Sequence, residues 1–146
     1  MSSNIQIDII NNIKEANLTS KEKSKLIQKV NTTFDAYKEP ISKLLWVSID
    51  EIIPNTYNPN KMAVPEKKLL SRSLILHGIT SPLIVTCQKE GKYILIDGYH
   101  RFNIIKRNKK LRERLDHKVP IVVLNLEDNE KIVATIRLIG QEVSIK

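Results

Sequence analysis

The sequence predicts an α/β (α+β) fold, in which flanking helices surround a small mixed sheet and a helical extension precedes it. Short apolar runs of strand length alternate with segments whose apolar residues recur at helical spacing. A length of 146 residues suffices for one domain with a hydrophobic core, and the 41% hydrophobic and 27% charged contents are typical of globular proteins. We therefore divide the chain into a helical N-terminal extension, residues 1–43, and a main domain, residues 44–146.

The sequence of the N-terminal extension predicts two amphipathic helices. The first is marked by apolar residues at helical spacing, namely Ile9, Ile10 and Ile13. Thr19 and Glu22 form a capping box that begins the second helix, and Pro40 interrupts its apolar pattern of Leu26, Val30, Phe34 and Tyr37. Two such helices bury little surface by themselves. They are expected to pack on the main domain or on a second copy, which would make a homodimer through residues 1–43.

The sequence of the main domain predicts strands that alternate with helices. The strands are the apolar runs 44–47, 82–87, 93–96 and 119–124. Pro65 suits the first turn of a helix that ends at Gly78 and has an apolar face of Leu69, Leu70, Leu74 and His77. Residues 54–60 are rich in turn formers and predict a loop. Pro120 either places the last strand at a sheet edge or marks its first residues. A closing helix is expected over 127–146, with a stripe of Ile132, Ile136 and Ile139.

The segment YILIDGYHRF, residues 93–102, is the most informative part of the chain. It predicts a buried strand, a glycine turn and the start of a helix. A glycine lets the chain turn sharply and lets a ligand approach the backbone, and a helix N-terminus offers unpaired N–H groups and a partial positive charge. The pattern predicts a phosphate site at Gly98, Tyr99, His100 and Arg101. A strand–turn–helix whose His and Arg are merely solvated remains equally open.

The net charge of +8 is concentrated in one part of the chain. Between residues 101 and 118, eight basic residues stand against Glu113 and Asp116, which gives a local net charge of 8 − 2 = +6. Lys and Arg without interleaved aromatic residues favour phosphate contact over base stacking. We predict nucleic-acid contact from Lys106, Arg107, Lys109, Lys110, Arg112 and Arg114. A solvated basic helix face is the alternative.

Several further patterns bound the class of protein. The single cysteine, Cys87, excludes an internal disulfide and is expected to be a buried, inert thiol. No apolar run approaches the ~18 residues of a membrane span, and the first residues lack the pattern of a secretory signal. The His residues are scattered, without metal-ligand spacing. These patterns predict a cytoplasmic protein with no membrane association and no structural metal.

Three segments in order resemble the N-terminal ParB-like domain of the ParB/sulfiredoxin fold. They are residues 69–85 (LLSRSLILHGITSPLIV), 93–101 (YILIDGYHR) and 119–123 (VPIVV), and the resemblance covers about residues 46–126. The DGYHR form of the turn, with the preceding loop 57–60 (YNPN), is most similar to the IbrB-like branch, described as co-activators of prophage gene expression. The resemblance implies a nucleotide pocket built from the glycine turn, the helix that it opens and the loop after the first strand.

The resemblance also implies the ligand and its contacts. Partition proteins of this fold bind CTP at a Gly-Glu-Arg-Arg turn, whose ends match Gly98 and Arg101. Sulfiredoxins hold ATP phosphates with a His-Arg pair, matched by His100 and Arg101. The implied cofactor is thus a nucleoside triphosphate, ATP or CTP, with Mg²⁺, and further implied contacts are Asn58, Asn60 and Ser81. The two Asn residues could equally make Asx turns. Tyr99 stands where sulfiredoxins have their Cys nucleophile, which argues against sulfiredoxin activity.

Three hypotheses for function follow. The leading one is a nucleotide-binding regulatory protein, phage- or prophage-associated, that acts in transcription regulation or another DNA-linked process, with DNA or an acidic protein as partner. The second is a small nucleotide-dependent enzyme, a kinase, NTPase or nuclease, that uses Asp97 and a metal as its catalytic groups. Asp97 is also able to cap the turn by bonding local N–H groups, which is the interpretation that the residues favour. The third is a DNA- or protein-binding module with a vestigial pocket.

Overall fold

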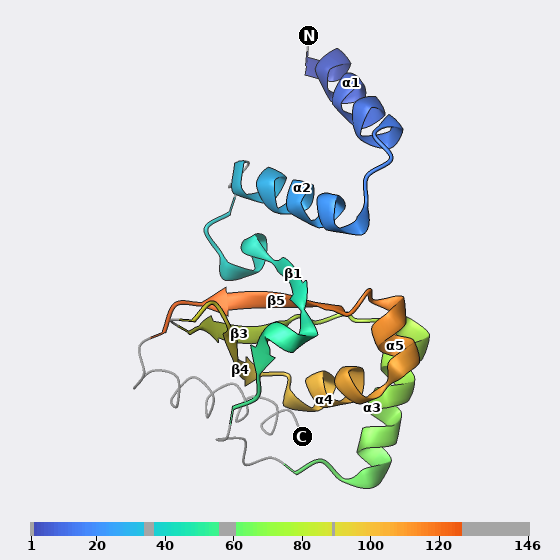
Figure 1. Cartoon of the computed structure of the whole chain (residues 1–146), viewed down its shortest axis with the longest axis vertical. Coiled ribbons are helices and arrows are strands. Elements are labelled where there is room, and N and C mark those ends of the chain that lie inside the picture. The colour runs from blue at the N-terminus through green and yellow to red at the C-terminus, as the bar shows by residue number, and fades with distance from the viewer. Residues whose placement is uncertain (1, 34–36, 56–60, 89, 127–146) are drawn as a thin grey trace. The chain divides into compact units, whose positions relative to one another are not determined.

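The computed structural model describes residues 2–33, 37–55, 61–88 and 90–126 (Figure 1). Contacts divide the chain into two compact units, Met1–Asp35 and Ala36–Lys146, whereas the sequence places the boundary after residue 43. The 3₁₀ helix η1 (Pro40–Lys43) packs against β5 (Lys118–Leu124), within the second unit. Among the described residues, no helix has the length and apolar character needed to cross a membrane.

The first unit contains two helices, α1 (Ser2–Glu15) and α2 (Ser20–Thr33). The predicted capping box is confirmed, because the N–H and hydroxyl of Thr19 donate to Glu22 Oε2 at 2.8 and 2.6 Å and the Glu22 N–H donates back to Thr19 Oγ1 at 3.4 Å. The Thr19 hydroxyl and then its N–H hold the pKa of the Glu22 carboxyl below its usual value. The predicted stripe of α1 is exposed, with exposed fractions of 52%, 50% and 41% for Ile9, Ile10 and Ile13.

The described residues of the second unit form a five-stranded mixed sheet with strand order β1-β5-β3-β4-β2. The strands are β1 (Leu45–Ser48), β2 (Ile52–Ile53), β3 (Leu83–Cys87), β4 (Tyr93–Asp97) and β5. Pairing is antiparallel for β1–β5 and β3–β4 and parallel for β3–β5 and β2–β4. The predicted strands are therefore confirmed, to within one residue at their ends. Strand β2 was not predicted, because two residues show no periodicity.

The position of Pro120 settles the alternatives for the last strand. β5 lies between β1 and β3, so the edge position is wrong. Pro120 is the third residue of β5 and lies opposite Trp46 of β1, while the ladder with β3 begins one residue later, at Leu83 and Ile121. The missing N–H of Pro120 therefore removes no bond from the β3 ladder. The proline marks the first residues of an internal strand.

Among the described residues of this unit, the α-helices are α3 (Val64–His77), α4 (Tyr99–Arg107) and α5 (Lys109–Arg114), which accompany the sheet (Figure 1). Helix α3 ends as predicted at Gly78, whose φ of 78° lies in the left-handed region. The basic residues between 101 and 118 do not lie on one helix, because the chain breaks at Asn108 between α4 and α5. The Asn108 side chain accepts a hydrogen bond from the Leu111 N–H at 3.0 Å and so caps the new helix.

One hydrophobic core joins the helices to the sheet. Its buried members include Leu74 of α3, Phe102 of α4, Leu111 of α5, and the strand residues Leu83, Val85, Leu95, Val119 and Ile121. The predicted apolar face of α3 is only partly correct, since Leu74 is buried and Leu70 half-buried, whereas Leu69 is 68% exposed and His77 is also exposed. Only one narrow stripe of this helix meets the core.

The expected burial of Cys87 is wrong. This residue is the last of β3, next to the turn into β4, and its side chain is exposed. It lies opposite Tyr93, where burial raises the pKa of the tyrosine hydroxyl. The predicted closing helix over 127–146, with Ile132, Ile136 and Ile139, lies outside the described residues, as does Phe34.

Candidate functional site

The turn between β4 and α4 requires a glycine for two reasons. Gly98 has φ 98° and ψ 21°, a left-handed conformation that side chains rarely adopt. A Cβ at this position would meet Leu83 Cδ2 at 2.5 Å and Arg101 Nη2 at 3.2 Å. The space beside Gly98 is thus filled by the protein's own side chains. Close approach of a ligand is not needed to explain this glycine.

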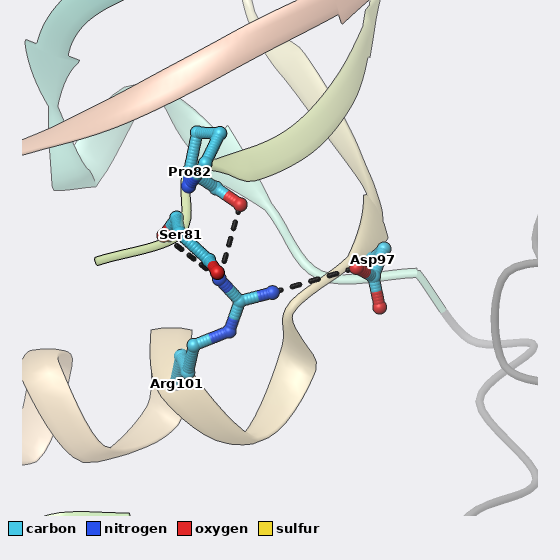
Figure 2. A network of polar contacts seen from close by, with 4 residues as sticks. All are labelled: Ser81, Pro82, Asp97 and Arg101. Carbon is cyan, nitrogen blue, oxygen red and sulfur yellow. Dashed lines mark hydrogen bonds and ion pairs between the residues drawn. The ribbon is translucent and has the colours of Figure 1, made fainter. Parts of the chain in front are cut away.

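Arg101 ties the start of β3 to the end of β4, as Figure 2 shows. Its Nη1 donates to the backbone carbonyls of Ser81 and Pro82 at 2.8 and 3.0 Å, and its Nη2 donates to Asp97 Oδ2 at 3.4 Å. The Arg101 and Asp97 side chains are only 16% and 17% exposed. Three of the five N–H donors of the guanidinium therefore have partners inside the fold. Phosphate contact by Arg101 stays a prediction, and its donors for a ligand are those that remain.

Asp97 has a different partner from the one that the sequence favours for a turn cap. Its described contact is the ion pair with Arg101, four residues further along the chain. Asp97 is at the end of β4 and Arg101 is in the first turn of α4, where a positive charge is unfavourable. The negative charge of Asp97 offsets that positive charge. A catalytic role for Asp97 stays a prediction, and such a role would have to release or share this contact.

Tyr99 and His100 begin α4 and are both half-buried. Their rings meet edge to face, with centroids 5.5 Å apart and planes at 75°, and Tyr99 also packs against the core. Gly98 has no side chain to accept hydrogen bonds from the first-turn N–H groups, and its carbonyl accepts from the Phe102 N–H at 2.8 Å. This combination of helix N-terminus and imidazole suits an anionic oxygen acceptor.

The remaining predicted nucleotide contacts divide into two groups. Ser81 lies at the site through its backbone carbonyl, which Arg101 holds, while the residue itself is exposed. Asn58 and Asn60 lie outside the described residues, so their predicted contacts with a nucleotide remain predictions.

A groove of about 610 Å³ lies between α3, α4 and α5. Its lining residues are Val64, Lys67, Lys68, Ser71, Asn103, Ile104, Arg107, Asn108, Lys109 and Lys110. Arg107, Lys109 and Lys110 were predicted as nucleic-acid contacts, and the structure brings them together in this groove. Lys67 and Lys68 were missed, although adjacent lysines near the start of a helix were a visible signal. We call this feature the basic groove.

Two of the other predicted nucleic-acid contacts, Arg114 and Lys106, have partners inside the fold. Arg114 donates from Nη1 to the carbonyl of Ile75 and from Nη2 to the carbonyl of Leu74, both at 2.8 Å, and so closes the C-terminus of α3. The Lys106 ammonium lies 5.3 Å from the centroid of the Phe102 ring. Arg112 is half-buried, and its Nε has no hydrogen-bond partner among the described residues.

Comparison with known proteins identifies the family. A family model of the ParB N-terminal domain matches residues 35–139. The chain belongs to the ParB N-terminal domain family. Two solved structures show the same fold at 22% identity. ParB from Caulobacter crescentus complexed with CTP-γ-S has a TM-score of 0.54 over 67% of this chain and 53% of that one. A Pnob8-like ParB-N domain has a TM-score of 0.52 over 70% of this chain and 38% of that one.

Two curated relatives are longer than this chain. The uncharacterized protein YbdM of Escherichia coli K12 is 41% identical over 100 residues, which cover 68% of this chain and 48% of that protein. The nucleoid occlusion protein of Listeria innocua is 31% identical over 110 residues, which cover 75% of this chain and 36% of that protein. The chain therefore spans half or less of the length of these relatives.

Proposed function

We propose that this chain is a cytoplasmic, nucleotide-binding ParB-like regulatory protein that acts in transcription regulation or another DNA-linked process. Its membership of the ParB N-terminal domain family and its similarity to nucleoid occlusion proteins support a DNA-linked role. The DGYHR form of the turn supports the IbrB-like branch and, with it, an association with phage or prophage genes.

The β4–α4 turn is the observation on which nucleotide binding rests. Gly98 leads into the N-terminus of α4, whose first turn carries His100. The ParB neighbour of the same fold was solved with CTP-γ-S. We infer that the phosphates of ATP or CTP bind at this N-terminus. Mg²⁺ would arrive with those phosphates and neutralise part of their charge. Arg101, fixed by Ser81 and Pro82, would present its remaining donors from a rigid position.

The proposal includes two kinds of macromolecular partner. The cluster of basic residues on α4 and α5 favours DNA or an acidic protein. The exposed isoleucines of α1 favour a second copy of the chain, bound through residues 1–43.

Calorimetric titration with ATP, ADP, CTP and GTP, each with Mg²⁺, tests the nucleotide site. Binding of at least one triphosphate is expected, and His100→Ala is expected to weaken it about ten- to hundredfold because a charge-assisted hydrogen bond is lost. His77→Ala, at an exposed position at the end of α3, is the matched control. Arg101→Ala is a poor probe, since it also frees two backbone carbonyls. If no nucleotide binds, or if both His variants bind equally, the turn is not a nucleotide site.

Measuring phosphate release by the same preparation separates a switch from an enzyme. Saturable binding without turnover would support the regulatory function. Turnover that is lost in Asp97→Asn while nucleotide binding persists would support the enzymatic alternative, with Asp97 and a metal at its centre.

A further inference from the structure

The basic groove gathers five cationic side chains from three helices. Lys67 and Lys68 come from α3, Arg107 ends α4, and Lys109 and Lys110 begin α5. None of the described residues that line the groove is acidic. Lys109 has a partner outside the lining, Glu113, at 3.7 Å, but both side chains are more than half exposed, so this pair contributes little. Like charges that line one groove repel one another, which favours an anionic occupant.

The neutral side chains of the basic groove also suit phosphate oxygens. Ser71, Asn103 and Asn108 add a hydroxyl and two amides. Asn108 uses its Oδ1 to accept the Leu111 N–H, so its NH₂ group is the part that can donate outward. Val64 and Ile104 are the apolar members, and no aromatic side chain is among the described lining residues. The groove therefore lacks the platform on which unpaired bases stack.

The cations of the basic groove suit a repeating phosphate backbone. Four of the five cations of the basic groove are lysines. The planar fork of an arginine fits carboxylate and phosphate alike, whereas a lysine ammonium is a compact charge with no fixed orientation. Lysines at different positions in a groove can each contact one phosphate of a regular backbone without contacting its bases.

We propose that the basic groove binds the phosphate backbone of duplex DNA, independently of base sequence, through Lys67, Lys68, Arg107, Lys109 and Lys110. This inference rests on the proposed DNA-linked function and gives it a surface. It is separate from the nucleotide turn, since none of the groove's lining residues belongs to the set from Gly98 to Arg101. With five contacts to phosphate, counterion release predicts a salt slope of about −4.5 and a loss of about five hundredfold in affinity between about 50 and 200 mM salt.

The test measures fluorescence anisotropy of a short labelled DNA duplex of arbitrary sequence, titrated with the full chain over a range of salt concentrations. The groove variant combines Lys68→Gln, Arg107→Gln and Lys110→Gln. The matched control removes the same charge from exposed lysines outside the groove, and combines Lys38→Gln, Lys43→Gln and Lys92→Gln. Far-UV circular dichroism and thermal unfolding of all three proteins verify that each is folded.

The groove variant is expected to lose at least about tenfold in affinity, and the magnitude of its salt slope is expected to fall by about 2.7. The control is expected to keep the slope of the parent. Equal behaviour of the two variants would overturn the proposal, as would a parent protein that binds no DNA at low salt. Stronger competition by polyglutamate than by unlabelled duplex would assign the groove to an acidic protein instead.

Nucleotide titration of the same variants separates this proposal from the proposed function. The groove variant is expected to bind nucleotide as the parent does. Loss of both ligands in the groove variant would make the groove part of the nucleotide site and would overturn a separate DNA surface. Loss of DNA alone would leave the nucleotide function intact, and a parent that binds DNA but no nucleotide would refute only the nucleotide function.

Discussion

At the scale of single residues, the β4–α4 turn depends on Gly98 more than on its charged neighbours. Its left-handed backbone and its contact with Leu83 both exclude a side chain. Gly78 offers an internal comparison, because its φ of 78° is also left-handed but no atom lies within 4 Å of the place where a Cβ would be. A positive φ thus strains a side chain at both positions, whereas crowding is expected at Gly98 only.

Gly98→Ala is expected to lower the free energy of unfolding more than Gly78→Ala does. Backbone strain alone costs about 1–3 kcal/mol at either site, and overpacking against Leu83 adds about 1–3 kcal/mol at Gly98 only. Urea denaturation of the two variants measures the difference. Equal losses would mean that Leu83 moves aside without cost.

The need for a glycine at this turn was predictable from the sequence, but the hydrogen-bond partners of the nearby side chains were not. The requirement for glycine at position 98 follows from a strand, a turn and a helix in succession. Arg101, in contrast, donates to carbonyls that lie 20 and 19 residues away in the chain, and Arg114 donates to carbonyls 39 and 40 residues away. A sequence displays the charge of these arginines and gives no sign of the backbone groups that receive it.

At the scale of elements, α5 provides hydrogen-bond donors to the C-terminus of α3. The last carbonyls of a helix lack partners within the helix, and at the end of α3 the Arg114 guanidinium supplies two donors together with a positive charge that suits a helix C-terminus. The break at Asn108 makes this contact available, because it begins a second helix instead of continuing α4.

Arg114→Ala is expected to destabilise the protein by about 1 kcal/mol, because the hydrogen bonds to α3 and the charge at its C-terminus are lost. Arg72→Ala, at an exposed position on α3 itself, is the control and is expected to change stability by less than about 0.5 kcal/mol. Hydrogen exchange of the amides in the last turn of α3 is expected to accelerate only in the Arg114 variant. Equal exchange rates in the two variants would contradict a closing role for Arg114.

Elements with a strong period were predictable, and those that depend on a neighbour were not. The four longer strands each form an apolar run, so the sequence placed them within one residue. Strand β2 has two residues and exists through its parallel pairing with β4. The Asn108 break was hidden because the basic residues on both sides suggest one continuous helix, although Asn is a common N-cap.

At the scale of the whole molecule, positive charge is distributed differently from its distribution along the sequence. The segment from residue 101 to 118 supplies +6 by sequence, yet Arg101 and Arg114 are engaged inside the fold. The basic groove instead recruits Lys67 and Lys68 from about forty residues earlier in the chain. A sequence count thus found the right region and an incomplete set of residues.

The exposed isoleucines of α1 bear on self-association of the whole molecule. The exposed stripe of α1 includes Ile5, Ile9 and Ile13, which are 60%, 52% and 41% exposed and lie four residues apart. If α1 pairs with a second copy, replacing all three with Ser is expected to shift sedimentation from dimer to monomer. Replacing the exposed polar residues Asn4, Asn11 and Asn12 with Ser is the control and is expected to leave the dimer intact. A parent protein that sediments as a monomer at all concentrations would refute the homodimer.

The lengths of the edge strands have a consequence for aggregation. Within the part of the chain that the structure describes, the sheet ends at β1 on one side and at β2 on the other, with four and two residues. An edge strand is a template for pairing with another chain in proportion to the unpaired N–H and C=O groups that it exposes. Both edges here are too short to direct an added strand over any distance. Association of this domain by β-strand addition is thus disfavoured, and concentrated solutions are expected to resist fibril formation through the sheet.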